Sequence, residues 1–156
     1  MTNNNSDNKK RKGFTVYVAS WIHWESKQGT FGFSIWNNTD NSLFYRDYLC
    51  EVLGSPSEGE IKALINALPH IPLGEPVLLK SSQSAVVTGI NYNLPEWERL
   101  NWRTKEDNPV KNKNEWSEIY NLISQGRKIL AVQIQDDEFN SLQNGCRKYL
   151  SFFENV

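Results

Sequence analysis

Basic side chains alternate with tryptophans between residues 97 and 116 of this chain. The residues in this pattern are Trp97, Arg99, Trp102, Arg103, Lys105, Lys111, Lys113 and Trp116. Cationic side chains neutralise phosphate groups and indole rings stack on bases, so the pattern is typical of a groove that holds a nucleic-acid backbone. The alternative is structural: Trp102 and Trp116 belong to the core, and acidic neighbours such as Glu106 and Asp107 turn the charges into a solvated face.

Two other groups of side chains carry acid–base or metal-binding chemistry. His23 and Glu25 lie two positions apart in a polar loop, where they form either an acid–base pair or plain surface. Asp136, Asp137 and Glu138 follow a predicted strand. These acids supply either a displaced metal site or favourable charges at a helix N-terminus, where the helix dipole stabilises them.

Two tryptophans lie in the same loop as His23. They are Trp21 and Trp24. Large aromatic rings anchor protein partners and also stack on unpaired bases. Both kinds of contact therefore remain open for this loop.

The segments around these residues alternate between strand and helix patterns. Residues 14–21, 29–36 and 42–52 are rich in β-branched and aromatic side chains and are separated by polar turns, which predicts an antiparallel meander. Short apolar runs at residues 77–79 and 128–135 predict two more strands. Helical patterns lie between and after them, so the order is that of an α/β domain.

Helix signals accompany three of these patterns. Ser57 and Glu60 fit a capping box, S-x-x-E, at the start of the first helix. Asn112 or Asn114 caps an amphipathic helix that runs to about residue 125, and Gly126 ends it. Pro95 suits the first turn of a shorter helix before it.

The order of the central motifs resembles type 1 ribonuclease H, an enzyme that cleaves the RNA strand of RNA–DNA hybrids. The matching pieces are VVTGI at 86–90, Trp97, WRT at 102–104, PVKN at 109–112 and Trp116, without an insertion. The resemblance covers residues 14–153. It implies a mixed five-stranded sheet, with strands 1–3 as the meander, flanked by helices.

The resemblance also implies which residues contact nucleic acid. The family holds the DNA strand with the Trp and Asn side chains of this region. Carried over to this chain, the nucleic-acid-binding residues are Trp97, Trp102, Arg103, Thr104, Lys111 and Asn112. The implied partner is an RNA–DNA hybrid or double-stranded RNA.

The resemblance implies four metal-binding acids, and three of them are replaced in this chain. The family's acids fall on Ala19, Glu60, Ser82 and Arg147. Two magnesium ions about 3.5–4 Å apart need hard oxygen ligands with enough negative charge to hold them together. The sequence therefore predicts a pseudoenzyme that binds no metal, with no intact catalytic residue.

Three functions follow from this interpretation. The first is a nucleic-acid-binding module that does not cleave. The second is a protein-interaction subunit or an inhibitor that uses Trp21 and Trp24. The third is an active, magnesium-dependent nuclease in which Glu60, Asp136 and Asp137 form a rearranged site. We also expect Arg147 to pair with Glu60 in place of the missing cations, because an arginine can compensate a desolvated carboxylate.

Length and composition predict one domain. The chain has 156 residues and a net charge of −1, so any basic surface is local. Residues 13–156 form the domain, and residues 1–12 are predicted to be a disordered basic tail that serves as a solubilising leader, a phosphate-binding arm or a nuclear address. Cys50 and Cys146 are expected to be reduced core residues. With no long apolar run and no signal-peptide pattern, the expectation is a cytoplasmic or nuclear protein without a membrane partner.

Overall fold

The segment FTVYVASWI is apolar on both faces, and it forms the central strand of the sheet. The structure is a computed structural model that describes residues 12–154. Its strands are β1 (Phe14–Ile22), β2 (Gln28–Asn37), β3 (Ser42–Val52), β4 (Pro76–Ser81) and β5 (Lys128–Gln133), in the order β3-β2-β1-β4-β5. The first three strands pair antiparallel, and β4 and β5 continue the sheet in parallel from β1. The predicted mixed five-stranded sheet is confirmed.

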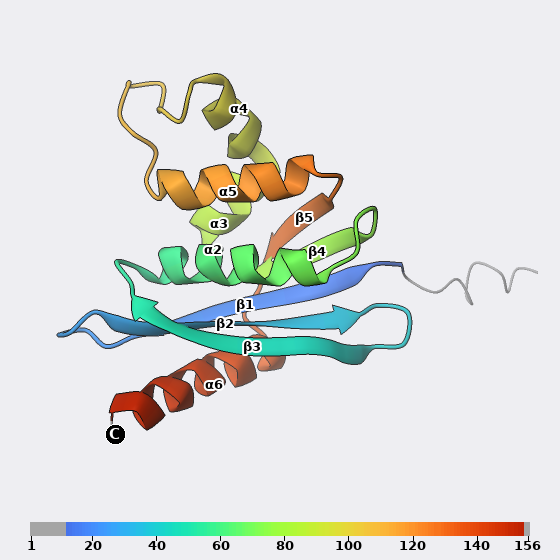
Figure 1. Cartoon of the computed structure of the whole chain (residues 1–156), viewed down its shortest axis with the longest axis vertical. Coiled ribbons are helices and arrows are strands. Elements are labelled where there is room, and N and C mark those ends of the chain that lie inside the picture. The colour runs from blue at the N-terminus through green and yellow to red at the C-terminus, as the bar shows by residue number, and fades with distance from the viewer. Residues whose placement is uncertain (1–11, 155–156) are drawn as a thin grey trace, which may run out of the picture.

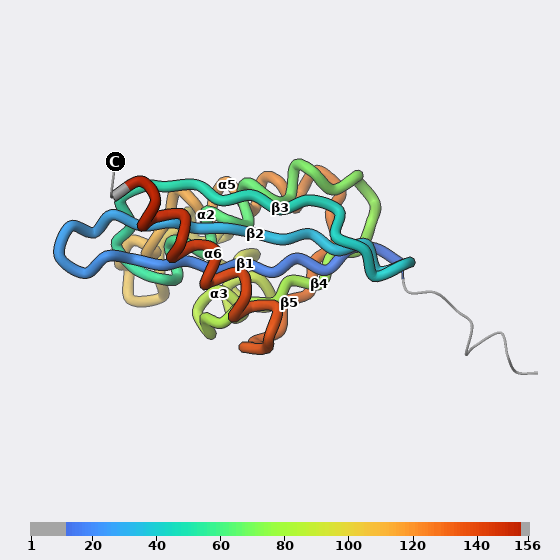
Figure 2. The backbone as a smooth tube through the Cα atoms, turned by 90° about the horizontal axis from the view of Figure 1, so that it is seen from below, coloured from blue at the N-terminus to red at the C-terminus, as the bar shows by residue number. Residues whose placement is uncertain are grey.

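Helices cover both faces of this sheet. They are α2 (Pro56–Ala67), η1 (Leu68–His70), α3 (Ser84–Thr88), η2 (Gly89–Asn93), α4 (Leu94–Arg99), α5 (Lys113–Ser124) and α6 (Asp137–Glu154). Figure 1 shows α2 on one face with α5 and α4 stacked outward from it, and α6 on the other face. In Figure 2, α6 crosses β1 and β2 on the side opposite α2.

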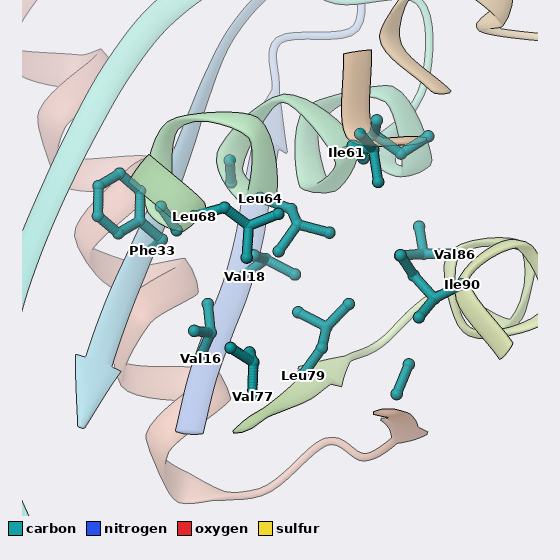
Figure 3. Close-up of a cluster of buried hydrophobic side chains, with 14 of the residues drawn as sticks. Val16, Val18, Phe33, Ile61, Leu64, Leu68, Val77, Leu79, Val86 and Ile90 are labelled. Carbon is teal, nitrogen blue, oxygen red and sulfur yellow. The ribbon is translucent and has the colours of Figure 1, made fainter. Parts of the chain in front are cut away.

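The larger part of the core lies between the sheet and α2. Val16 and Val18 of β1 are fully buried and face this layer, together with Leu64 of α2 and Leu79 of β4. Figure 3 shows the side chains of the two strands and the helix meeting there. Since successive residues of a strand point to opposite faces, Tyr17 and Ala19 point to the other layer.

The smaller core layer lies between the sheet and α6. Ala19 packs there with Phe139, Leu142 and Cys146. The prediction that both cysteines are core residues is half wrong, since Cys146 is buried and Cys50 is exposed. Cys50 lies on β3, which is one of the two edge strands of the sheet.

The start of α2 differs from the prediction. The N-cap is Ser55, whose side chain accepts a hydrogen bond from the Glu58 backbone N–H, and the Glu58 carboxylate accepts one from Gly54 N at 2.7 Å. The predicted capping box at Ser57 and Glu60 is therefore wrong. The same S-x-x-E spacing occurs two residues earlier, and Pro56 favours a helix start there. Glu60 therefore takes no part in the cap, and its side chain is buried inside the protein.

Two expectations fall partly outside this description. The predicted basic tail at residues 1–12 lies, except for Lys12, outside the described residues. Of the helices between residues 12 and 154, none combines the length and the apolar character that a membrane span requires.

Candidate nucleic-acid interface

A groove of about 470 Å³ lies between α2, α3 and the segment that precedes α5. We call residues 94–112 the handle and this cavity the handle groove. Four of the six predicted nucleic-acid contacts line it, namely Trp97, Thr104, Lys111 and Asn112, and Ser57 of α2 and Ser84 of α3 complete its floor. The groove therefore combines an indole face, a cation and several hydrogen-bonding side chains.

The floor of the handle groove depends on one glycine. Trp116 of α5 is only 3% exposed, and its ring lies 5.4 Å from that of Trp97. A Cβ atom on Gly89 would lie 2.4 Å from the Trp116 ring, so no larger residue fits at position 89. The core interpretation of Trp116 is thus correct, and this buried ring supports Trp97 at the groove.

The side chain of Asn112 is available to a ligand. Asn112 occupies the N-cap position of α5 with φ of 60°, but its side chain makes no capping hydrogen bond. Its backbone oxygen accepts the hydrogen bond from Trp116 N at 2.9 Å. A left-handed asparagine is tolerated at such a position, because its short polar side chain lowers the strain.

The two remaining predicted contacts do not line the handle groove. Trp102 packs edge-on against Tyr120 at 6.0 Å between ring centroids. Arg103 forms an ion pair with Asp107 at 2.5 Å and also bonds to the Asp107 backbone oxygen. The structure thus divides the six residues into a groove group and a pair that holds the handle loop together.

The four positions that match the family's acids lie on or beside four different elements. Ala19 is on β1, Glu60 is in α2, Ser82 follows β4 and Arg147 is in α6. The Ala19 methyl group is completely buried, and the Cys146 thiol lies 3.7 Å from the Ala19 carbonyl oxygen. Ala19 therefore presents only a methyl group at this point.

Glu60 is held by serine hydroxyls. The Ser81 hydroxyl donates to one carboxylate oxygen at 2.5 Å, and the Ser82 hydroxyl donates to the other at 2.5 Å. The Ser82 backbone N–H adds a third contact at 3.3 Å. The side chain is 1% exposed, and burial raises the pKa of Glu60 to about 7 although these three hydrogen bonds act in the opposite direction.

Arg147 does not compensate Glu60. Its side chain is exposed, and its guanidinium lies over the Trp21 ring, 5.8 Å from the ring centroid. Within residues 12–154, Glu60 makes no ion pair. The expected Arg147–Glu60 pair is therefore wrong.

Gln143 of α6, one helical turn before Arg147, also reaches β1. Its amide nitrogen donates to the Ser20 carbonyl oxygen at 3.2 Å, directly beside Ala19. On the opposite face, α2 packs closely against Ser20 because residue 59 is a glycine. A Cβ atom at this position would lie only 2.5 Å from the Ser20 Cβ. The sequence motifs did not indicate Gln143 or Ser81. For Gln143, the only hint was its position one helical turn, i to i+4, before the matched residue Arg147.

The acids at the start of α6 have structural contacts. One Asp136 carboxylate oxygen accepts from Phe139 N at 3.0 Å, and the other accepts from the Tyr17 hydroxyl at 3.1 Å. Asp137 and Glu138 lie in the first turn of the helix. In the described part of the chain, no three His, Cys, Asp or Glu side chains gather closely enough to hold a metal ion. The helix-terminus interpretation of Asp136 is thus confirmed, and Glu60, Asp136 and Asp137 do not form one cluster.

The end of β1 and the loop that follows it present aromatic side chains to solvent. Trp24 lies in the loop and is 81% exposed, whereas Trp21 lies in β1 rather than in the predicted loop and is 39% exposed. His23 bonds through Nδ1 to the Ser26 hydroxyl at 3.2 Å rather than to Glu25. The geometry thus supports the surface interpretation of His23 and leaves the two indoles free to contact a partner.

Comparison with solved structures places this architecture in a known class. The PFV RNase H domain superposes with a TM-score of 0.72 at 15% identity, covering 92% of this chain and 96% of that one. LC11-RNase H1, solved in complex with an RNA/DNA hybrid, gives a TM-score of 0.63 at 13% identity, covering 88% of this chain and 99% of that one. The fold is that of an RNase H-like α/β protein.

The sequence comparisons identify the family. The family model for RNase H matches residues 11–135, and the chain belongs to this family. The ribonuclease H of Thiobacillus denitrificans is 35% identical over 68 residues, which is 44% of this chain and 46% of the relative. The ribonuclease H of Clostridium botulinum is 28% identical over 90 residues, which is 57% of this chain and 60% of the relative. The chain thus spans about half the length of the curated relatives it matches.

Proposed function

We propose that this chain binds an RNA–DNA hybrid in the handle groove and does not cleave it. The observation that carries the binding half is the convergence of Trp97, Thr104, Lys111 and Asn112 on one groove. A cation beside an aromatic face and free amide donors suits a phosphate backbone. The RNase H neighbour solved with an RNA/DNA hybrid makes that duplex the first ligand to test.

The second half of the proposal rests on the ligand chemistry around Glu60. Two-metal catalysis needs several carboxylates around the scissile phosphate. This chain offers a methyl group at Ala19, and the hydroxyls of Ser81 and Ser82 already occupy both oxygens of Glu60. Because burial raises the pKa of Glu60 to about 7, this carboxyl is not fully ionised at neutral pH. A pseudoenzyme that still binds the duplex explains both the groove residues and the missing metal ligands.

The test compares two asparagines that lie two residues apart. Asn112 lines the handle groove, whereas Asn114 is exposed and does not line it. Asn112→Asp keeps the side-chain shape and tolerates the left-handed backbone, but it brings a negative charge to the proposed phosphate contact. We expect a hybrid labelled with a fluorophore to bind at least tenfold more weakly to Asn112→Asp than to Asn114→Asp at low salt. Equal binding by both variants would show that the handle is only scaffold.

Three duplexes of the same length and sequence define the ligand. The proposal predicts tighter binding of the RNA–DNA hybrid than of double-stranded DNA, because the 2′-hydroxyl distinguishes RNA from DNA. Double-stranded RNA measures how far the groove accepts two RNA strands. Failure of all three duplexes to bind at low salt contradicts the proposal.

A further inference from the structure

A second cavity, of about 330 Å³, opens beside the replaced acid positions. We call it the hairpin pocket. Its walls come from Trp21, Trp24 and Lys27 of the β1–β2 hairpin, Pro56 at the start of α2, Gln83 after β4 and Gln143 of α6. Four segments distant in sequence therefore meet around it. Neither the family comparison nor the handle groove accounts for this pocket.

The hairpin pocket carries two exposed indoles, each with a cation over its face. The Lys27 ammonium lies 4.9 Å from the Trp24 ring centroid, and the Arg147 guanidinium lies 5.8 Å from that of Trp21. A cation held against an aromatic face leaves its remaining donors directed outward. Each ring thus brings a stacking surface and a positive charge to the same place, which are the two groups that a nucleotide requires.

Polar groups and nearby acids fit the same ligand. Gln143 donates its amide N–H to Ser20, and its amide oxygen accepts no hydrogen bond from a described residue. This oxygen is suited to a base edge. No Asp or Glu is among the described residues that line the pocket. Glu58, which follows the lining residues Ser55 and Pro56, is engaged by Gly54 N at 2.7 Å and lies 3.5 Å from the Lys62 ammonium. Its charge is therefore compensated and does not repel an entering phosphate.

The hairpin pocket adjoins the handle groove. Pro56 lines the pocket and its neighbour Ser57 lines the groove. In the same way, Gln83 lines the pocket and Ser84 lines the groove. On each of these two segments, consecutive residues therefore line the two different cavities. The pocket therefore lies next to the place where a strand extending from a duplex in the groove would emerge.

We propose that the hairpin pocket binds an unpaired nucleotide of a strand that extends from the duplex in the handle groove. The base stacks on Trp24 and Trp21, and the flanking phosphate contacts Lys27 and Arg147. This inference extends the proposed hybrid binding, and the pocket can be tested separately from the groove. The preferred substrate is then a hybrid with a single-stranded extension rather than a blunt hybrid.

The experiment measures binding of two hybrids with the same duplex, one blunt and one with a four-nucleotide pyrimidine extension. Stacking of a base on an aromatic side chain predicts that the extension increases affinity about tenfold. Trp24→Ala should abolish this increase and leave the affinity for the blunt hybrid unchanged, whereas Trp24→Phe should keep most of it. Phe44→Ala is the matched control. Phe44 is an exposed aromatic residue near the start of β3, and it does not line the hairpin pocket.

A pyrimidine oligonucleotide without a duplex separates the two proposals. If it binds the unmodified protein and not Trp24→Ala while the blunt hybrid does not bind, the pocket is supported and the handle groove is not. If hybrids bind but the extension adds nothing, or if Trp24→Ala keeps the full increase, the pocket proposal is wrong. The aromatic hairpin would then be a surface for a protein partner.

Discussion

At the scale of single residues, Glu60 shows how this fold accommodates a carboxylate without a cation. Burial of a charged group is unfavourable unless hydrogen bonds compensate it. Ser81 and Ser82 provide those bonds, one hydroxyl to each oxygen. They cannot supply a positive charge, so the carboxylate keeps a raised pKa of about 7. The same hydroxyls occupy the lone pairs that a metal ion would use.

The raised pKa makes the stability of the protein depend on pH. A carboxyl group that titrates at about 7 in the folded state and at about 4.5 when unfolded binds more protons in the folded state between those values. The stabilising contribution is therefore complete below pH 4.5 and is lost as the pH rises to about 7.

Glu60→Gln removes this dependence, because the amide does not titrate. From urea unfolding at pH 4.5 and pH 8, we expect the free energy of unfolding of the unmodified protein to fall relative to Glu60→Gln by up to about 3 kcal/mol. Parallel pH profiles of the two proteins would show that Glu60 is not the titrating group.

At the scale of secondary-structure elements, two helix starts define the candidate site. The cap of α2 at Ser55 sets the helix phase that turns Glu60 inward. The uncapped start of α5 leaves the Asn112 side chain directed to the handle groove. Backbone hydrogen bonding at these two termini therefore decides which polar side chains are available to a ligand.

The cap of α2 can be tested with two serines. Ser55→Ala removes the hydrogen bond to Glu58 N and should lower the free energy of unfolding by about 1 kcal/mol. Ser57→Ala removes a partly exposed hydroxyl that donates to Gln83 and should have less than half of that effect. Thermal and urea unfolding measure both. A larger loss of unfolding free energy in Ser57→Ala than in Ser55→Ala would show that Ser57 is the N-cap, as predicted from the sequence.

The salt dependence of hybrid binding tests the handle groove. Lys111 lines the groove, whereas Lys105 lies in the same loop and does not line it. Each phosphate contact that is lost lowers the slope of log K against log salt by about one unit. We expect this change in Lys111→Ala and a clearly smaller one in Lys105→Ala. The same slope in Lys111→Ala as in the unmodified protein would remove Lys111 from the interface.

At the scale of the whole molecule, the sheet was the most predictable feature. Each strand carries its own local signal in β-branched and apolar residues, and the motifs from residue 86 to 116 fix the order of the elements between β4 and α5. The groove residues Trp97, Lys111 and Asn112 were predictable for the same reason, since they belong to short motifs within one contiguous segment.

Contacts between distant elements were not predictable. One turn of helix, about 5.4 Å, separates Gln143 from Arg147, and no motif in the last helix fixes which of them lies beside β1. The proximity of Ser81 to Glu60 depends on where α2 begins, and two overlapping S-x-x-E patterns were present there. The hairpin pocket is built from four separate segments, so no single stretch of sequence indicates it.

Thermal unfolding with metal tests the whole site at once. A ligand raises the melting temperature only if it binds the native state more tightly than the unfolded state. We expect millimolar magnesium or manganese to leave the melting temperature within the error of a potassium control at equal ionic strength. A rise that disappears on chelation would show a metal site despite the missing carboxylates.

The most direct test of the central claim follows one labelled RNA–DNA hybrid for both binding and integrity. Fluorescence anisotropy reports the complex at low salt with magnesium or manganese present, and denaturing electrophoresis of the same samples reports the RNA strand. We predict a saturable rise in anisotropy with an intact RNA strand, and weaker binding by Asn112→Asp. The account is contradicted if the hybrid does not bind, or if the RNA is cleaved in a reaction that stops on chelation and in Glu60→Gln.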